Sequence, residues 1–173
     1  MITIETGFDG LILIEPKIFD DHRGRFYESW SRERYQSVGI KEDFVQQDIS
    51  ISVKNVLRGL HFQGSQSQIV SIIKGVIFDV AVDMRPTSNT YLKHFSVILD
   101  DTSPRQLYMS AGFAHGFCVL SDEAVLHYDC SEYYRPSHEG GIIWNDPVLG
   151  IKWPITHPIL SMKDQQFKGV SCL

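Results

Sequence analysis

Short segments in which apolar and polar residues alternate run through most of this sequence, and they constrain its fold more than any other feature. In residues 76–85, every second residue from Val76 to Met84 is apolar, while Asp79, Asp83 and Arg85 fall between them. Successive side chains of a strand point to opposite faces, so this pattern predicts a strand with two distinct faces. The sequence predicts further strands over residues 95–99, 105–110, 116–120 and 124–130, separated by turns rich in Pro, Ser, Asn and Asp.

Two segments depart from this alternation. Residues 31–39 start with Ser31, a helix-capping residue type, and end with Gly39, which predicts a short helix in the N-terminal part of the chain. Residues 147–158 contain three prolines, so we expect an irregular C-terminal tail there. Many short strands with little helix predict an all-β fold, with a double-sheet jelly roll as a good candidate. No linker divides the 173 residues, and we expect a single domain over 1–173.

The charge balance limits the partners. The net charge is −5 at pH 7, which argues against nucleic acid as a partner because an extended nucleic-acid surface needs a basic face. A few clustered arginines can still bind a small anion. The longest apolar stretches, such as residues 11–14, are far too short to span a membrane. The three cysteines show no CxxC spacing, which favours free thiols in a reducing cytoplasm.

The spacing of residues around two histidines favours one class of β fold. His61, Gln63, Gln68 and Gly75 reproduce the spacing of the first cupin motif, and residues 112–115, which end in His115, reproduce part of the second. Neutral amides at Gln63 and Gln68 are poor ligands for a transition metal, and two histidines alone rarely hold a catalytic ion. The sequence therefore predicts a cupin jelly roll, a double-stranded β-helix, without a metal. Imidazole has an unperturbed pKa of about 6.5, so a histidine inside such a barrel suits proton abstraction.

Several longer strings make the chain similar to one family. VLRGLHFQ (56–63), GFAHGFCVLSD (112–122), YDCSEYYRP (128–136) and PILSMKD (158–164) resemble the dTDP-4-dehydrorhamnose 3,5-epimerase family, the cofactor-free cupins of nucleotide-sugar biosynthesis. The resemblance implies epimerisation of a nucleotide-linked 4-keto-6-deoxy sugar, with dTDP-4-dehydro-6-deoxy-D-glucose as the default substrate. An α-proton would be removed and returned on the opposite face through an enolate, without a cofactor.

The resemblance also assigns residues. It implies that His61 is the base, that Asp164 orients it and that Tyr128 donates a proton to the other face. Arg23, Arg58 and Lys163 match cationic positions that hold the substrate, and Tyr134 matches an aromatic residue that stacks on the base. Arg23 would reach the neighbouring subunit's site, which implies a homodimer. The substrate-binding positions implied in this way are Arg23, Glu28, Gln46, Arg58, Gln68, His115, Tyr134, Glu139 and Lys163.

Two positions depart from the family pattern. The segment from His61 to Gly75 is shorter than usual, and Gln68 falls where the family has a lysine near the enolate oxygen. As a neutral donor, Gln68 would stabilise an oxyanion less than an ammonium does, unless another cation such as Lys74 replaces it. Asp48 stands where the family commonly has asparagine.

These departures leave alternatives open. One is a single 3- or 5-epimerase, or a ketoisomerase, on a dTDP-, CDP- or GDP-linked 4-keto sugar. Another is a non-catalytic cupin that binds sugar nucleotides. A metal-dependent cupin dioxygenase would require ligands that Gln63 and Gln68 do not supply.

Overall fold

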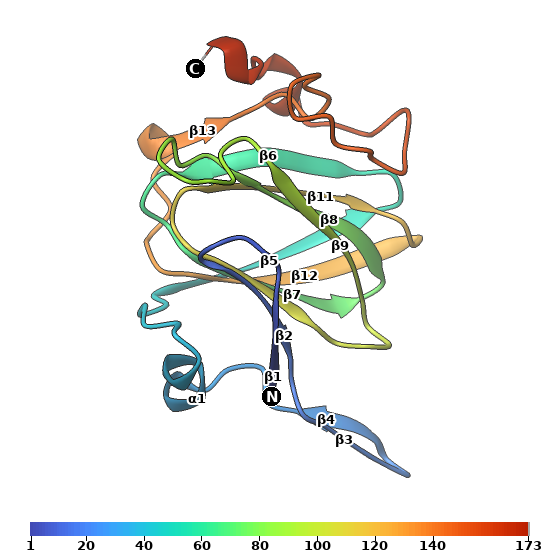
Figure 1. Ribbon diagram of the computed structural model, residues 1–173. Helices are drawn as coiled ribbons and strands as arrows, with labels where there is room; N and C mark the ends of the chain where they lie inside the picture. The colour runs from blue at the N-terminus through green and yellow to red at the C-terminus, as the bar shows by residue number, and fades with distance from the viewer. Residues whose placement is uncertain (173) are drawn as a thin grey trace.

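Two antiparallel β-sheets face each other and enclose the interior of the protein, as the computed structural model of residues 1–172 shows (Figure 1). This arrangement confirms the predicted all-β jelly roll. The six-stranded sheet has the order β1 (Ile2–Glu5), β2 (Leu11–Glu15), β10 (Gln106–Met109), β7 (Gln68–Lys74), β12 (Glu123–Cys130), β5 (Gln46–Val53). The five-stranded sheet has the order β13 (Glu139–Gly141), β6 (Leu57–Gln63), β11 (Phe113–Val119), β8 (Val76–Asp83), β9 (His94–Asp100).

The main hydrophobic core fills part of the space between these sheets. Val70 and Ile72 of β7 contribute to it from the six-stranded sheet, and Phe117 and Val119 of β11 contribute from the five-stranded sheet. Burying an aliphatic or aromatic side chain of this size contributes about 1.5–3 kcal/mol, so this layer is a major source of stability. Alternation along β7 and β12 places Gln68, Tyr128 and Cys130 on the same inward face, beyond the end of the apolar layer.

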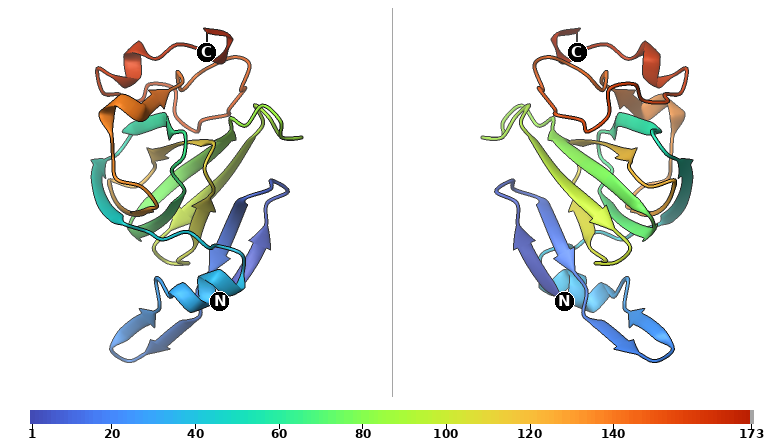
Figure 2. Two further views of the ribbon diagram at one scale, coloured as in Figure 1. Left: turned by 90° about the vertical axis from the view of Figure 1, so that its left-hand side faces the viewer. Right: turned by 90° about the vertical axis from the view of Figure 1, so that its right-hand side faces the viewer.

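Both faces of the β8 strand are buried, in contrast to a strand with one solvated face. Val80 and Val82 pack under the C-terminal part of the chain, together with Ile142 and Leu149. The other face, which carries the fully buried Asp79, points to the interior between the sheets. The segment of residues 147–158 contains no helix or strand, as predicted, but it packs over the five-stranded sheet and is not only an irregular surface chain (Figure 2).

The structure confirms the short helix and the predicted strands with small shifts of their ends. The helix α1 spans Arg32–Ser37, and Gly39 follows it with a φ of +96° that glycine adopts without strain. Ser31 stands at the N-cap but its side chain makes no capping hydrogen bond. The strand predicted at 116–120 begins earlier, at Phe113, because its pairing with β8 continues to Asp83.

One hairpin projects away from the two sheets. Strands β3 (Ile18–Asp21) and β4 (Gly24–Tyr27) pair only with each other, and their turn extends into solvent (Figures 1 and 2). The 3₁₀ helices η1 (Pro136–His138), η2 (Asp164–Gln166) and η3 (Val170–Cys172) lie in the C-terminal part. No helix within residues 1–172 is long and apolar enough to cross a membrane.

Candidate active site

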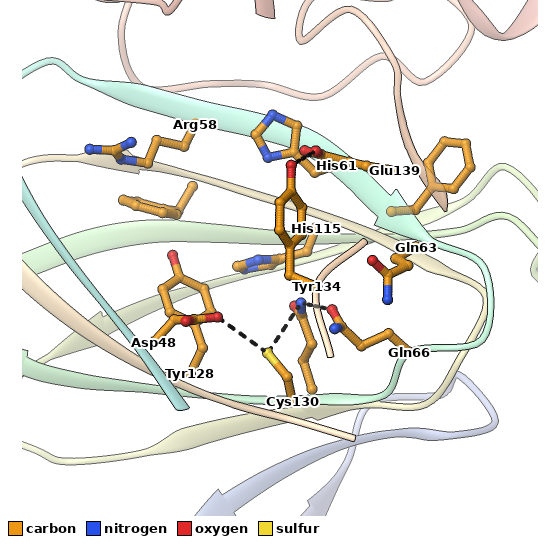
Figure 3. Close-up of a pocket in the computed structure, with 13 residues that line it drawn as sticks. Asp48, Arg58, His61, Gln63, Gln66, His115, Tyr128, Cys130, Tyr134 and Glu139 are labelled. Carbon is orange, nitrogen blue, oxygen red and sulfur yellow. Dashed lines mark hydrogen bonds between the residues drawn. The ribbon is translucent and has the colours of Figure 1, made fainter. Parts of the chain in front are cut away.

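A pocket opens between the two sheets at the end that the apolar core leaves unfilled. His61 and Tyr128 enter it from opposite sides, His61 from β6 of one sheet and Tyr128 from β12 of the other (Figure 3). The pocket brings together most of the residues that the resemblance implies. Those that line it are Arg58, His61, Gln68, His115, Tyr128, Tyr134 and Glu139.

His61 is bonded to a buried carboxylate. Its Nε2 lies 2.6 Å from Oδ1 of Asp164, the first residue of η2, although the two residues are 103 positions apart. Burial disfavours ionisation of Asp164, but the hydrogen bond and charge of His61 outweigh it and hold the pKa of this carboxyl below its usual value. The carboxylate fixes the ring orientation, and Nδ1 is the nitrogen left to accept a proton from a substrate.

A close approach of two strands sets the position of His61. Gly59 has a φ of +126°, and a Cβ there would lie 2.5 Å from Cα of Gly116 on β11. Only glycine permits this contact. The pairing of β6 with β11 then sets His61 directly opposite His115, so both imidazoles face the same pocket.

His115 forms a second histidine–carboxylate pair. Its Nε2 lies 2.8 Å from Oδ2 of Asp79 on β8. Within residues 1–172 the other oxygen of Asp79 is buried and has no hydrogen-bond partner. The His115 ring packs edge-on against Tyr128 and stacks on Phe117. This pair therefore forms part of the wall against which Tyr128 rests.

Tyr128 is kept protonated by its surroundings. Burial raises the pKa of Tyr128 far above its usual value, and the nearby negative charge of Asp79 raises it further, while Arg58 opposes this shift. The phenol therefore carries its proton at neutral pH. It can donate this proton to a strongly basic carbon on the side of the pocket opposite His61.

A network at the rim joins four of the implied binding residues. The Tyr134 hydroxyl donates to Oε2 of Glu139 at 2.5 Å, and the Lys163 ammonium donates to the same oxygen. Burial disfavours the charge on Glu139, but the hydrogen bonds from Lys163 and Tyr134 prevail and lower the pKa of Glu139. Oε1 of Gln46 accepts from the backbone N–H of Tyr134 at 2.9 Å, so Gln46 supports the rim from outside the pocket lining.

Arg58 is the single Lys or Arg side chain that lines the pocket within the part of the chain that the structure describes. Its Nε donates to Oγ of Ser52 at 3.0 Å, which leaves the remaining guanidinium N–H groups for a ligand. The suggestion that Lys74 replaces a missing cation is wrong. Its ammonium lies at the surface, 3.0 Å from Glu123, and takes no part in lining the pocket.

Arg23 and Glu28 lie outside the pocket of their own chain. Arg23 follows β3 in the turn of the projecting hairpin and pairs with Asp21 at 2.6 Å. Glu28 follows β4 and pairs with Arg34 of α1 at 2.6 Å. Because the hairpin points away from the sheets, neither residue reaches the site of the same chain.

Several residues in the pocket or directly behind its wall escaped the sequence-based assignment. The buried Asp79 was visible as a charged residue within an alternating strand, but its partner His115 is 36 positions away. Phe117, Cys130 and Gln66 line the pocket only because of the way the sheets pair. Among residues 1–172, no group of three or more His, Cys, Asp or Glu side chains is arranged to hold a metal ion.

Comparison with known proteins identifies the family to which the chain belongs. The family model described as dTDP-4-dehydrorhamnose 3,5-epimerase matches residues 5–171. The chain belongs to this family. A dTDP-4-dehydrorhamnose 3,5-epimerase of Methanothermobacter thermautotrophicus is 45 % identical over 170 residues, which cover 95 % of this chain and 92 % of the relative.

Two further relatives mark the range of activities within the family. A solved structure of a dTDP-6-deoxy-D-glucose-3,5-epimerase from Legionella pneumophila, in complex with dTDP-4-keto-L-rhamnose, is 45 % identical with a TM-score of 0.95, covering 98 % of this chain and 93 % of that one. A protein of Streptomyces niveus named dTDP-4-dehydrorhamnose 3-epimerase is 40 % identical over 163 residues, covering 92 % of this chain and 79 % of the relative.

Proposed function

We propose that this epimerase-family protein inverts C3 and C5 of a nucleotide-linked 4-keto-6-deoxy sugar, with dTDP-4-dehydro-6-deoxy-D-glucose as the default substrate. One observation carries the proposal. A histidine bonded to a buried carboxylate and a protonated tyrosine enter one pocket from opposite sheets. Removing a proton from one face of a carbon and returning one to the other face requires this arrangement of base and acid.

Both proton transfers follow from this arrangement. Nδ1 of His61 takes the proton from a carbon next to the C4 ketone, and the electron pair of that C–H bond moves into the carbonyl to form an enolate. The imidazolium is stabilised by Asp164 at 2.6 Å. The Tyr128 O–H then protonates the same carbon from the opposite face, which restores the ketone and inverts the carbon. The reaction is redox-neutral and consists of proton transfers, so we propose that it uses no cofactor.

The charged groups of the site suit a nucleoside diphosphate sugar. Arg58 offers free guanidinium N–H groups, and such groups bind diphosphate oxygens in pairs. Lys163 lies at the rim with its charge balanced by Glu139. Tyr134 is 52 % exposed beside the pocket, where its ring is available for stacking on a nucleobase.

A homodimer would complete the site. The outer face of the six-stranded sheet carries a strip of apolar side chains, here called the β5 strip, each between 55 % and 66 % exposed: Ile49, Ile51, Val53 and Ile73. An apolar strip beside an open sheet edge marks an interaction surface, because monomers rarely leave such side chains in water. We propose that a second copy docks on this strip and that its hairpin reaches the site. The hairpin pairs with no other strand of its own chain and carries Arg23, 79 % exposed, at its turn, which supports the expectation that Arg23 binds substrate in the neighbouring subunit.

Exchange in heavy water tests the activity. The protein is incubated with dTDP-4-keto-6-deoxyglucose in deuterium oxide, and deuterium at C3 and C5 is followed by NMR. We expect deuterium at both carbons and loss of both signals in His61→Asn. His157→Asn is the matched control, because His157 is exposed in the C-terminal tail outside this pocket and should leave exchange unchanged. Absence of exchange with dTDP-, CDP- and GDP-linked substrates would contradict the proposal and favour a non-catalytic sugar-nucleotide-binding protein.

The same experiment separates the second candidate function. The Streptomyces niveus relative bears the name of a 3-epimerase, so epimerisation of a single carbon is the alternative that the comparisons favour. Deuterium at C3 alone would identify that activity. Deuterium at C5 alone would identify a 5-epimerase.

A further inference from the structure

A line of side-chain amides runs along the side of the pocket opposite His61. Gln66 donates from Nε2 to the backbone carbonyl of Glu132 at 2.9 Å. Gln68 donates from Nε2 to Oε1 of Gln66 at 2.6 Å, and the same nitrogen lies 4.0 Å from the sulfur of Cys130. The line therefore has a direction, from Gln68 through Gln66 to Glu132.

The backbone carbonyl fixes this direction. A carbonyl oxygen only accepts hydrogen bonds, so the Gln66 atom that faces Glu132 must be the amide nitrogen. The Gln66 oxygen then faces Gln68, and the Gln68 atom beside it must again be nitrogen. Both N–H groups of Gln68 are directed at protein atoms, the Gln66 oxygen and the Cys130 sulfur.

The oxygen of the Gln68 amide, Oε1, accepts no hydrogen bond from the described residues. No residue between 1 and 172 donates a hydrogen bond to Oε1 of Gln68, and this oxygen is absent from the buried polar atoms that lack a partner, so it is accessible in the pocket. Gln68 thus presents an acceptor to a ligand. This contradicts the idea from the sequence that Gln68 acts as a weak donor to an enolate oxygen.

The side chain of Asp48, close to Gln68, is also a hydrogen-bond acceptor. Asp48 of β5 lines the pocket next to Cys130. Its Oδ2 accepts from Nε2 of Gln46 at 2.8 Å and lies 3.9 Å from the Cys130 sulfur, while no residue between 1 and 172 donates to its Oδ1. Gln68 and Asp48 together make an acceptor side of the pocket, whereas Arg58 and Tyr128 supply donors. A 4-keto sugar has matching groups, because its keto oxygen only accepts hydrogen bonds and its hydroxyls can donate.

We propose that Oε1 of Gln68 accepts a hydrogen bond from a ring hydroxyl of the sugar, and that Gln68 thereby determines specificity for a hydroxylated sugar. Gln66 is the positioning residue that holds the Gln68 oxygen toward the ligand. The inference rests on the proposed epimerase function. A site built around such an acceptor disfavours an analogue that lacks the hydroxyl, because the acceptor is left without a partner.

Deoxy substrates test the inference. Deuterium exchange at C5, a carbon that all the substrates share, is measured as kcat/KM for dTDP-4-keto-6-deoxyglucose and for its 2-deoxy and 3-deoxy analogues. Gln68→Met, which keeps the length of the side chain, should lower kcat/KM for the parent substrate by about three- to tenfold. With one of the two deoxy analogues the loss should disappear, since the contacted hydroxyl is already missing.

Variants at two other positions serve as controls. Gln66→Met should reproduce part of the loss and the same dependence on the hydroxyl, since it frees the Gln68 amide to turn. Gln36→Met, on the exposed face of α1, should change none of the rates. Thermal unfolding and dTDP affinity are measured for each variant to show that the fold and the nucleotide site are intact.

The outcomes separate this inference from the proposed function. An equal loss with all three substrates, or no loss with any, overturns the role of Gln68 while leaving the epimerase function standing. Failure of the wild-type protein to exchange deuterium with the parent substrate overturns both. A loss that disappears with one deoxy analogue supports both.

Discussion

Asp164 determines how well His61 can act as a base, because it holds one ring nitrogen and leaves the other for substrate. The variant Asp164→Asn keeps the shape but removes the charge that stabilises the imidazolium. We expect kcat to fall roughly 10²- to 10⁴-fold with little change in KM. Deuterium exchange at C5 measures the effect. Asp122→Asn changes an exposed carboxylate paired with Lys54 and should leave kcat as it is.

Replacing Tyr128 should affect deuterium exchange and inversion of the carbon to different extents. In Tyr128→Phe, His61 can still remove a proton and return deuterium to the same face, because the histidine–carboxylate pair is untouched. We expect exchange to stay within about tenfold of wild type while formation of inverted product falls at least about a hundredfold. NMR reads both quantities in one sample. An equal fall in exchange and inversion would show that Tyr128 is not the acid for the opposite face.

At the scale of elements, β6 and β11 approach each other too closely for a side chain at Gly59. Gly59→Ala would set a Cβ 2.5 Å from Cα of Gly116 in a backbone conformation that alanine disfavours. We expect a loss of about 3 kcal/mol in the free energy of unfolding. Gly64→Ala is the matched control, because a Cβ at Gly64 meets no atom within 4 Å. Urea unfolding compares the two variants.

The turn after β8 depends on one buried carboxylate. Asp83 is fully buried, and burial disfavours its charge, but hydrogen bonds from Arg85, Ser88 and Thr90 outweigh burial and lower the pKa of Asp83. A lowered pKa in the folded state stabilises the protein above the unfolded value of 3.8, and this stabilisation is lost as pH falls below it. We expect Asp83→Asn to cost about 3 kcal/mol at pH 7. In urea titrations its deficit against wild type should shrink between pH 4 and pH 2.

The elements also show how far the sequence alone could predict the molecule. Alternation predicted strands such as β8 and β12 well, because it is a local property of the chain. It could not tell that the polar face of β8 points inward, since that depends on the tail that covers the other face. The pairs His61–Asp164 and His115–Asp79 depend on sheet pairing across 103 and 36 positions. Resemblance supplied the first pair, and nothing local indicated the second.

At the scale of the whole molecule, an acidic chain has to bind an anionic substrate. The net charge is −5, and within residues 1–172 one cation, Arg58, lines the pocket. Lys163 is balanced by Glu139. The diphosphate of a sugar nucleotide carries two negative charges, and one arginine does not balance both. The hairpin of a second subunit, with Arg23 79 % exposed at its turn, is a source of that charge.

Mixed dimers test whether Arg23 acts across subunits. Arg23→Ala and His61→Asn should each be inactive, for different reasons. If Arg23 serves the partner's site, a dimer of one variant with the other has one complete site, with wild-type His61 from one chain and wild-type Arg23 from its partner. Random exchange of subunits should then restore activity to about a quarter of wild type. The β5 strip provides the control: with Ile51→Lys in both chains, sedimentation should show monomers and mixing should restore nothing. Mixing without recovery, although mixed dimers form, would show that Arg23 acts within its own chain.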